Sequence, residues 1–161
     1  MFNVYSLFSV NVFEGKIIVP INIHKKILNI IEEKYEKEGK RDSCVNGFQY
    51  HENFDGKKEL NEIINKHLLS MHNLKIINGW LNVLENQSYN LPHSHTADDI
   101  KMAGVLYLSS QNTNITFTRE GEVFEIKPKM FQYLIFPFNL VHYVLPENIM
   151  QKRISYAFNL K

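Results

Sequence analysis

Short apolar and aromatic runs, separated by turn residues, follow one another through the second half of this 161-residue chain. Each run has a length typical of a single β-strand, and Pro, Gly and Asn residues interrupt the series. Because many short strands in succession pair into a sandwich or a barrel, this half of the chain is predicted to form one β-unit. The expected strands cover residues 75–84, 101–108, 114–118, 123–127, 130–136, 141–145 and 153–160.

Two amphipathic helices are predicted in the first half of the chain. In the first, apolar residues recur at helical spacing between Asn22, the expected N-cap, and Gly39, near which the helix should end. The second helix covers about residues 57–73, and the Asp55 side chain is expected to cap its start. We expect both helices to pack against one face of the β-unit.

The segments that flank the first helix carry weaker signals. Residues 4–12 and 16–20 are typical of a strand pair, with a turn at Glu14-Gly15 between them. Residues 40–56 are rich in turn-forming residues and show no sustained period, so we expect a loop with one short strand at most. The predicted fold class is therefore mainly β with α.

The composition is that of one globular domain spanning residues 1–161, since 44% of the residues are hydrophobic and 12% are aromatic. Eighteen basic residues against seventeen acidic ones give a formal charge of +1, so no overall field marks a nucleic-acid or membrane-surface binder. No apolar run approaches the ~18 residues that a membrane span needs. Because Cys44 is the single cysteine and the first residues lack a signal-peptide pattern, we expect a cytoplasmic protein.

Three histidines are candidate ligands of one metal ion. His93 and His95 are two positions apart, so on an ideal strand both side chains share a face, although Pro92 makes this segment less regular. His142 follows in another apolar strand, and two strands of a barrel can share a metal. Imidazole suits iron, copper, nickel and zinc alike, so the spacing predicts a site without selecting its ion.

Each of these histidines also has an ordinary alternative role, as a surface residue or as a hydrogen-bonded residue of the core. The metal interpretation rests on their combination. The other four histidines occupy unrelated positions on the helices or in the loop, and we expect them to be structural or solvated: His24, His51, His67 and His72.

Arg153 begins the last predicted strand, and Ser155 lies two positions further on, hence on the same face. A guanidinium inside a barrel needs an anionic partner, and a carboxylate bound in a bidentate manner is the usual one, with a hydroxyl completing the hydrogen bonds. The alternative is an arginine at the strand edge that reaches solvent or pairs with Glu147.

These residues lie in segments that resemble the 2-oxoglutarate and Fe(II)-dependent oxygenases, in particular small members of that superfamily from bacteriophage and bacterial genomes. The order and spacing agree over roughly residues 79–160, half of the chain. The matching segments are Gly79-Trp80-Leu81-Asn82-Val83, Pro92-His93-Ser94-His95, Ala103-Gly104-Val105-Leu106-Tyr107-Leu108, Phe136-Pro137 with His142-Tyr143-Val144, and Arg153-Ile154-Ser155 with Phe158-Asn159.

The resemblance implies a double-stranded β-helix, or jelly roll, buttressed by the two N-terminal helices. By position, His93 and His142 would bind Fe(II), and Arg153 with Ser155 would hold the distal carboxylate of 2-oxoglutarate. Tyr107 would bond the same carboxylate or serve as a core aromatic residue.

His95 departs from the wider superfamily, which has Asp or Glu at this position. We expect His95 to be the third metal ligand, and a third neutral imidazole would leave more positive charge on the iron. Asp98 or Asp99 is the alternative ligand. In that case His95 would not bind the metal itself but would contact the residues that do. Trp80 and Asn82 are expected to line the mouth of the pocket.

The activity implied is that of a 2-oxoglutarate- and Fe(II)-dependent dioxygenase that hydroxylates a C–H bond. A peptidyl side chain is the first expected substrate, ahead of small molecules and nucleic acid, and the near-neutral charge disfavours DNA. The alternative is a non-catalytic, cupin-like jelly-roll protein that binds a metal or ligand. No oligomeric state is predicted.

Overall fold

The computed structural model describes residues 3–7, 10–35, 43–96, 99–110 and 113–161. The strands found there are β1 (Asn3–Leu7), β2 (Val10–Lys16), β3 (Cys44–Val45), β4 (Phe48–Tyr50), β5 (Ile76–Leu84), β6 (Tyr89–His93), β7 (Met102–Tyr107), β8 (Ile115–Arg119), β9 (Glu122–Ile126), β10 (Gln132–Pro137), β11 (Val141–Val144) and β12 (Arg153–Leu160), and the helices are α1 (Ile21–Lys34) and α2 (Lys57–His72).

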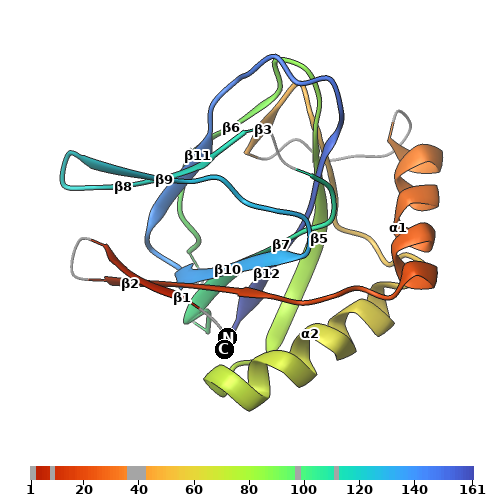
Figure 1. The fold of residues 1–161 in the computed structure, drawn as a ribbon, viewed down its shortest axis with the longest axis horizontal. Coiled ribbons are helices and arrows are strands. Elements are labelled where there is room, and N and C mark those ends of the chain that lie inside the picture. The colour runs from red at the N-terminus through yellow and green to blue at the C-terminus, as the bar shows by residue number, and fades with distance from the viewer. Residues whose placement is uncertain (1–2, 8–9, 36–42, 97–98, 111–112) are drawn as a thin grey trace.

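The strands form two antiparallel sheets (Figure 1). The larger sheet has the strand order β1-β2-β10-β7-β12-β5-β4, and the smaller has the order β3-β6-β11-β8-β9. One apolar cluster combines Tyr107 and Leu134 of the larger sheet with Phe117 and Ile126 of the smaller, so the two sheets face each other across a shared interior. The fold is mainly β with two helices, as predicted.

The central strands of the larger sheet are buried on both faces because α1 and α2 cover its outer face (Figure 1). Ile27 of α1 and Ile64 of α2 are fully buried in one cluster with Tyr156 and Phe158 of β12. The residues that alternate with these along β12, such as Ser155, point into the space between the sheets. This arrangement explains why strands such as β7 and β10 are almost continuously apolar.

The predicted turn at Glu14-Gly15 is wrong, because both residues lie inside β2. In the observed hairpin, Leu7 is in register with Val10. A Cβ atom on Gly15 would collide with the Tyr133 ring of the neighbouring strand β10. This glycine therefore makes room for a ring within a sheet, which is a second common use of glycine in strands.

Helix α1 starts without the predicted cap. Asn22 lies inside the helix. Pro20 is the residue that directly precedes the helix, and no side chain forms a capping hydrogen bond with the first turn. Proline suits this position because it lacks an N–H group and its φ is fixed near the helical value. The helix ends at Lys34, and Gly39, near which we predicted its end, lies outside the described residues.

Helix α2 also starts without a side-chain cap, so the role predicted for Asp55 is wrong. Gly56 precedes the helix with a left-handed φ of 91°, which glycine adopts without strain. The Asp55 carboxylate instead accepts a hydrogen bond from Lys26 of α1 at 2.9 Å. Neither described helix combines the length and apolar character needed to cross a membrane.

All of the strands predicted after residue 74 are present, with ends shifted by no more than two residues. The structure adds β6, whose last residue is His93, and it divides the predicted loop at residues 40–56 into β3, β4 and their connections. Both additions belong to the region where the candidate site lies.

Candidate functional site

Strands β6 and β11 place His93 and His142 opposite each other in the smaller sheet. Their ring centroids are 4.4 Å apart. His95 lies beyond the end of β6, where its backbone N–H donates a hydrogen bond to the carbonyl oxygen of Phe138 at 2.8 Å. This bond ties the segment after β6 to the turn between β10 and β11, close to His142.

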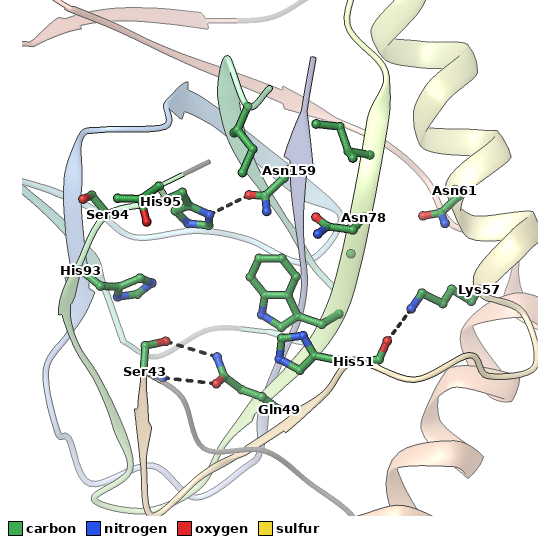
Figure 2. A pocket seen from close by; sticks show the side chains of 15 residues that line it. Ser43, Gln49, His51, Lys57, Asn61, Asn78, His93, Ser94, His95 and Asn159 are labelled. Carbon is green, nitrogen blue, oxygen red and sulfur yellow. Dashed lines mark hydrogen bonds between the residues drawn. The ribbon is translucent and has the colours of Figure 1, made fainter. Parts of the chain in front are cut away.

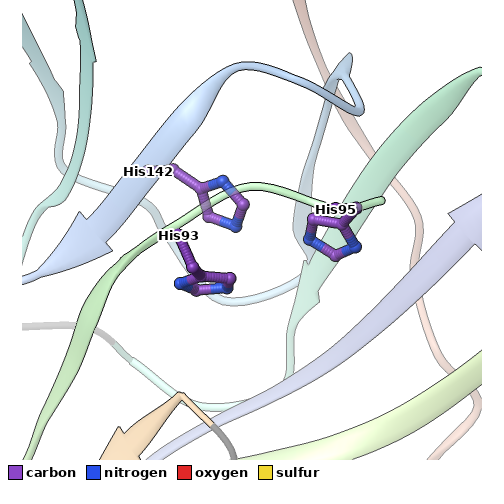
Figure 3. Close-up of side chains that lie close together, drawn as sticks. All are labelled: His93, His95 and His142. Carbon is purple, nitrogen blue, oxygen red and sulfur yellow. The ribbon is translucent and has the colours of Figure 1, made fainter. Parts of the chain in front are cut away.

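The three imidazoles converge (Figure 3). One ring nitrogen from each histidine lies within 4.8 Å of the other two. The ring centroid of His95 is 5.3 Å from that of His142 and 5.8 Å from that of His93. No other group of His, Cys, Asp or Glu side chains in the described ranges approaches in this way. These three residues are named the histidine cluster below.

Every ring of the histidine cluster uses its Nδ1 atom in a hydrogen bond. The partners are the backbone carbonyl of Leu91 for His93, at 2.7 Å, and that of Leu140 for His142, at 3.0 Å. A carbonyl oxygen only accepts, so Nδ1 carries the proton in both rings and Nε2 keeps its lone pair. The partner of His95 is Oδ1 of Asn159, at 2.6 Å, which requires the same tautomer.

Burial lowers the pKa of all three imidazoles, most strongly that of His142, which falls to about 3. The nearby imidazoles lower the pKa values of His142 and His95 further, while the acceptor on each Nδ1 acts in the opposite direction. The three rings are therefore neutral near pH 7. Neutral imidazole is the form that binds a metal ion.

The residues predicted to bind a carboxylate lie side by side across the larger sheet. Arg153 and Ser155 are 3% and 1% exposed, and Ser155 is in register with Tyr107 of β7 and Asn82 of β5. The guanidinium carbon of Arg153 is 5.2 Å from the centre of the Tyr107 ring. These residues and the histidine cluster line one inner cavity of about 50 Å³.

Three buried polar atoms in this cavity have no hydrogen-bond partner among the described residues: Nε of Arg153, Oη of Tyr107 and Oδ1 of Asn82. Burial lowers the pKa of the Arg153 guanidinium and raises the pKa of Tyr107 to about 12. The predicted alternative, an arginine at the strand edge that reaches solvent, does not hold because Arg153 is buried, although the charge of the exposed Glu147 still raises the pKa of Arg153. Buried polar groups are rarely left unpaired in proteins, so this cavity suits a polar ligand.

A larger outer groove of about 760 Å³ opens beyond the histidine cluster (Figure 2). It shares His93, His95 and Trp80 with the inner cavity and extends along β5 to Lys57 of α2. The Trp80 indole stacks on the His51 ring at 5.2 Å and 7°, and its centroid is 6.0 Å from that of His95. Trp80 thus forms the wall where the two spaces meet.

Asp99, His24 and His67 do not belong to the histidine cluster. Asp99 is exposed, and Asp98 lies outside the described residues. His24 is buried and hydrogen-bonds the carbonyl oxygen of Leu108 through Nε2 at 2.7 Å. His67 contacts Tyr133 on the helix-covered face of the sheet. His24 and His67 are therefore structural histidines.

Several residues of the site carried no functional prediction. His51 was expected to be structural or solvated, yet it lines the outer groove, and nothing in its sequence context indicates this. Gln49 also lines the groove and exchanges hydrogen bonds with Ser43. Asn159 had a usable signal, because it has the same parity along β12 as Arg153 and Ser155 and therefore faces the same side.

The donor set fits the ion and co-substrate that the resemblance implies. Three neutral imidazoles with unshared Nε2 lone pairs suit a divalent transition metal such as Fe(II). A buried guanidinium whose Nε lacks a partner, beside two hydroxyl groups, suits a carboxylate.

Comparisons with solved structures find oxygenases of this fold. A prolyl-4-hydroxylase from Pseudomonas putida has a TM-score of 0.69 at 12% identity, covering 97% of this chain and 95% of that chain. HygX from Streptomyces hygroscopicus, with nickel, 2-oxoglutarate and hygromycin B bound, has a TM-score of 0.71 at 10% identity, covering 92% and 82%. A prolyl hydroxylase from Trichoplax adhaerens, in complex with a hypoxia inducible factor peptide fragment, has a TM-score of 0.66 at 13% identity, covering 92% and 83%.

At these identities the likeness concerns the fold. The chain has the fold of 2-oxoglutarate and Fe(II)-dependent oxygenases, which confirms the resemblance read from its second half at that level. A scan against protein-family models and a search of curated protein sequences find no match.

Proposed function

We propose that this protein is a 2-oxoglutarate- and Fe(II)-dependent dioxygenase that hydroxylates a peptidyl side chain or a small molecule. One observation carries the proposal: three converging imidazoles and a buried, incompletely paired guanidinium line the same inner cavity. A structural histidine cluster would need no arginine beside it. The two sheets would then form a double-stranded β-helix, and residues 1–161 would be a single cytoplasmic domain.

In this proposal, His93, His95 and His142 hold Fe(II) through Nε2. The Nδ1 acceptors fix the orientation of each ring, so little entropy is lost when the ion binds. Bound Fe(II) together with 2-oxoglutarate and oxygen supplies the oxidising chemistry that hydroxylates a C–H bond. The role of the protein is to orient the reactants and exclude water.

Arg153, Ser155 and Tyr107 bind the distal carboxylate of 2-oxoglutarate in this proposal. The guanidinium provides charge-assisted hydrogen bonds, and the two hydroxyl groups donate to the remaining lone pairs. With its pKa raised to about 12, Tyr107 keeps its proton and remains a donor. Asn82 completes the polar lining from β5.

The outer groove is the proposed substrate site. Substrate would lie along β5 and reach the histidine cluster past Trp80. Some proteins of this fold are seen with a peptide fragment and others with hygromycin B, so both a peptide and a small molecule remain substrate candidates here.

An anaerobic titration with Fe(II) and then 2-oxoglutarate tests the proposal. We expect a visible metal-to-ligand charge-transfer band, and succinate release once air is admitted. His142→Ala should abolish both signals, whereas His67→Gln, a change of a histidine on α2, should preserve them. A wild-type protein that gives neither band nor succinate would refute the enzymatic function.

One observation supports a second candidate, a non-catalytic, cupin-like protein that binds a metal or ligand. His95 stands where the wider superfamily has a carboxylate, so the ligand set carries no negative charge of its own. This candidate predicts tight binding of a divalent ion without succinate release from 2-oxoglutarate. The titration separates the two functions, because only the enzyme would release succinate.

A further inference from the structure

His95 differs from the other two rings of the histidine cluster in what fixes its tautomer. His93 and His142 each bond a backbone carbonyl two residues earlier in the chain, an acceptor that no substitution can remove. His95 bonds a side chain, the amide of Asn159, from the opposite sheet. The orientation of one candidate ligand thus depends on a residue that can be changed.

Asn159 is well placed to fix this ring. It is 7% exposed, and it pairs in register with Asn78 on one side and Ala103 on the other, in the interior of the larger sheet. Figure 2 shows its amide directed at the His95 ring. The 2.6 Å contact between Nδ1 and Oδ1 is short for a hydrogen bond between neutral groups.

The chemistry of the contact decides which nitrogen of His95 can bind a metal. If Oδ1 of the amide faces the ring, Nδ1 carries the proton and Nε2 keeps a lone pair that is free to bind a metal ion. If the amide nitrogen faced the ring, the proton would sit on Nε2, and that atom could not be a ligand. Partners behind a metal-bound histidine typically set both the ring orientation and the strength of binding.

We propose that Asn159 is a positioning residue that makes His95 a metal ligand by holding it as the Nδ1-protonated tautomer. This inference rests on the proposed metal site. It explains how an imidazole can occupy a position where a carboxylate is the rule: β12 supplies the acceptor that orients it. The strand that carries Arg153 at its start carries this acceptor near its end.

Two measurements on the full chain test the proposal. Long-range proton–nitrogen NMR of the metal-free, 15N-labelled protein at pH 8 reports which nitrogen of His95 is protonated, and we expect Nδ1. Titration with Co(II) reports affinity and, through the ligand-field spectrum, coordination. Asn159→Leu should remove the tautomer preference and weaken Co(II) binding on the order of 10- to 100-fold.

Asn159→Asp should rescue the site, because a carboxylate accepts the same Nδ1 proton, and Co(II) should bind at least as tightly as in the wild type. Asn78→Leu is the matched control, since Asn78 is the cross-strand neighbour of Asn159 but does not bond His95; tautomer and affinity should not change. A wild-type ring protonated at Nε2, or unchanged Co(II) affinity in a folded Asn159→Leu variant, would overturn the proposal.

The two proposals fail separately. If the protein forms no succinate, the enzymatic function is lost, while the tautomer and Co(II) measurements still decide the role of Asn159. Should Asn159→Leu not fold, the wild-type tautomer and the Asn159→Asp affinity remain decisive, because a drop in affinity with the acceptor retained would contradict the proposal.

Discussion

At the scale of single residues, Arg153 is the most demanding part of the site. Arg153 is 3% exposed and its Nε atom has no hydrogen-bond partner in the described part of the chain, so the fold bears the cost of a buried, incompletely paired charge. A group held in this state is stabilised when an anion binds. The stability of the ligand-free protein and its affinity for 2-oxoglutarate should therefore respond in opposite ways to a change at this position.

We expect Arg153→Met to weaken binding of 2-oxoglutarate to the metal-loaded protein by about 100-fold or more, because charge-assisted hydrogen bonds are lost. The melting temperature of the ligand-free protein should be unchanged or higher, since an uncompensated charge is removed. Calorimetry measures both quantities. Lys152→Met, at the neighbouring half-exposed lysine, is the control and should leave the affinity unchanged. Equal affinities in both variants would contradict the assignment of Arg153.

The histidine cluster should make the stability of the metal-free protein depend on pH. The pKa of His142 is about 3 in the folded protein, below its ordinary value of 6.5, so the unfolded chain binds more protons between these values. The free energy of unfolding should therefore be largest above pH 6.5 and fall as the pH decreases from there toward 3. His93 and His95, whose pKa values are also lowered, contribute with the same sign.

Urea unfolding at several pH values measures this dependence. His142 alone contributes a slope of at most about 1.4 kcal/mol per pH unit. His142→Gln should give a shallower slope between pH 4 and 6 than the wild type. His67→Gln removes a less buried imidazole on α2 whose pKa burial also lowers, so it should change the slope less. Parallel curves for wild type and His142→Gln would show that this ring does not titrate as its burial implies.

At this scale, sequence reasoning located the histidines and Arg153 through their residue types and spacing. It had no access to the partner of each ring nitrogen, which depends on contacts between segments far apart in the chain. The bond between His95 and Asn159 joins residues 64 positions apart, and the stacking of His51 on Trp80 joins the residue that follows β4 to strand β5. Neither contact leaves a local pattern.

At the scale of elements, the larger sheet depends on close approach between β7 and β12. Gly104 of β7 is in register with Phe158 of β12, whose fully buried ring lies over the glycine. A Cβ atom at position 104 would collide with that ring. The absence of a side chain at position 104 of β7 therefore allows the Phe158 ring to pack between the sheet and the helices.

We expect Gly104→Ala to lower the free energy of unfolding by about 1–3 kcal/mol, the usual cost of overpacking a core. Chemical denaturation measures the change. In the double variant Gly104→Ala/Phe158→Leu the two losses should sum to less than their separate values, because the smaller side chain relieves the collision. Fully additive losses would mean that the ring of Phe158 does not oppose a side chain at position 104.

The elements were predicted correctly where the local hydrophobic pattern alone defines them. Strands buried on both faces appear as apolar runs, and β7, β10 and β12 were all predicted within two residues of their ends. The errors concerned a turn and a helix cap. Gly15 was read as a turn, although it makes room for Tyr133, and Asp55 was read as a cap, although it pairs with Lys26. In both cases a tertiary contact outweighed the local preference.

At the scale of the whole molecule, the mainly β class and the packing of two helices on one face followed from the order of patterns along the chain. The strand order did not, because pairing partners such as β5 and β12 are separated in sequence by four of the five strands of the smaller sheet. The sequence also did not show which sheet carries which residues of the candidate site. The smaller sheet holds His93 and His142, and the larger holds Arg153, Ser155 and Tyr107.

Strand β12 lies in the interior of the larger sheet, between β7 and β5, and it presents both Arg153 and Asn159 to the space between the sheets. We expect the backbone amides of such a strand to exchange with solvent mainly through large-scale opening of the sheet. We therefore expect the proposed binding site for the co-substrate and the proposed support of His95 to be lost together when the sheet opens. The local stability of the candidate site should therefore equal that of the protein core.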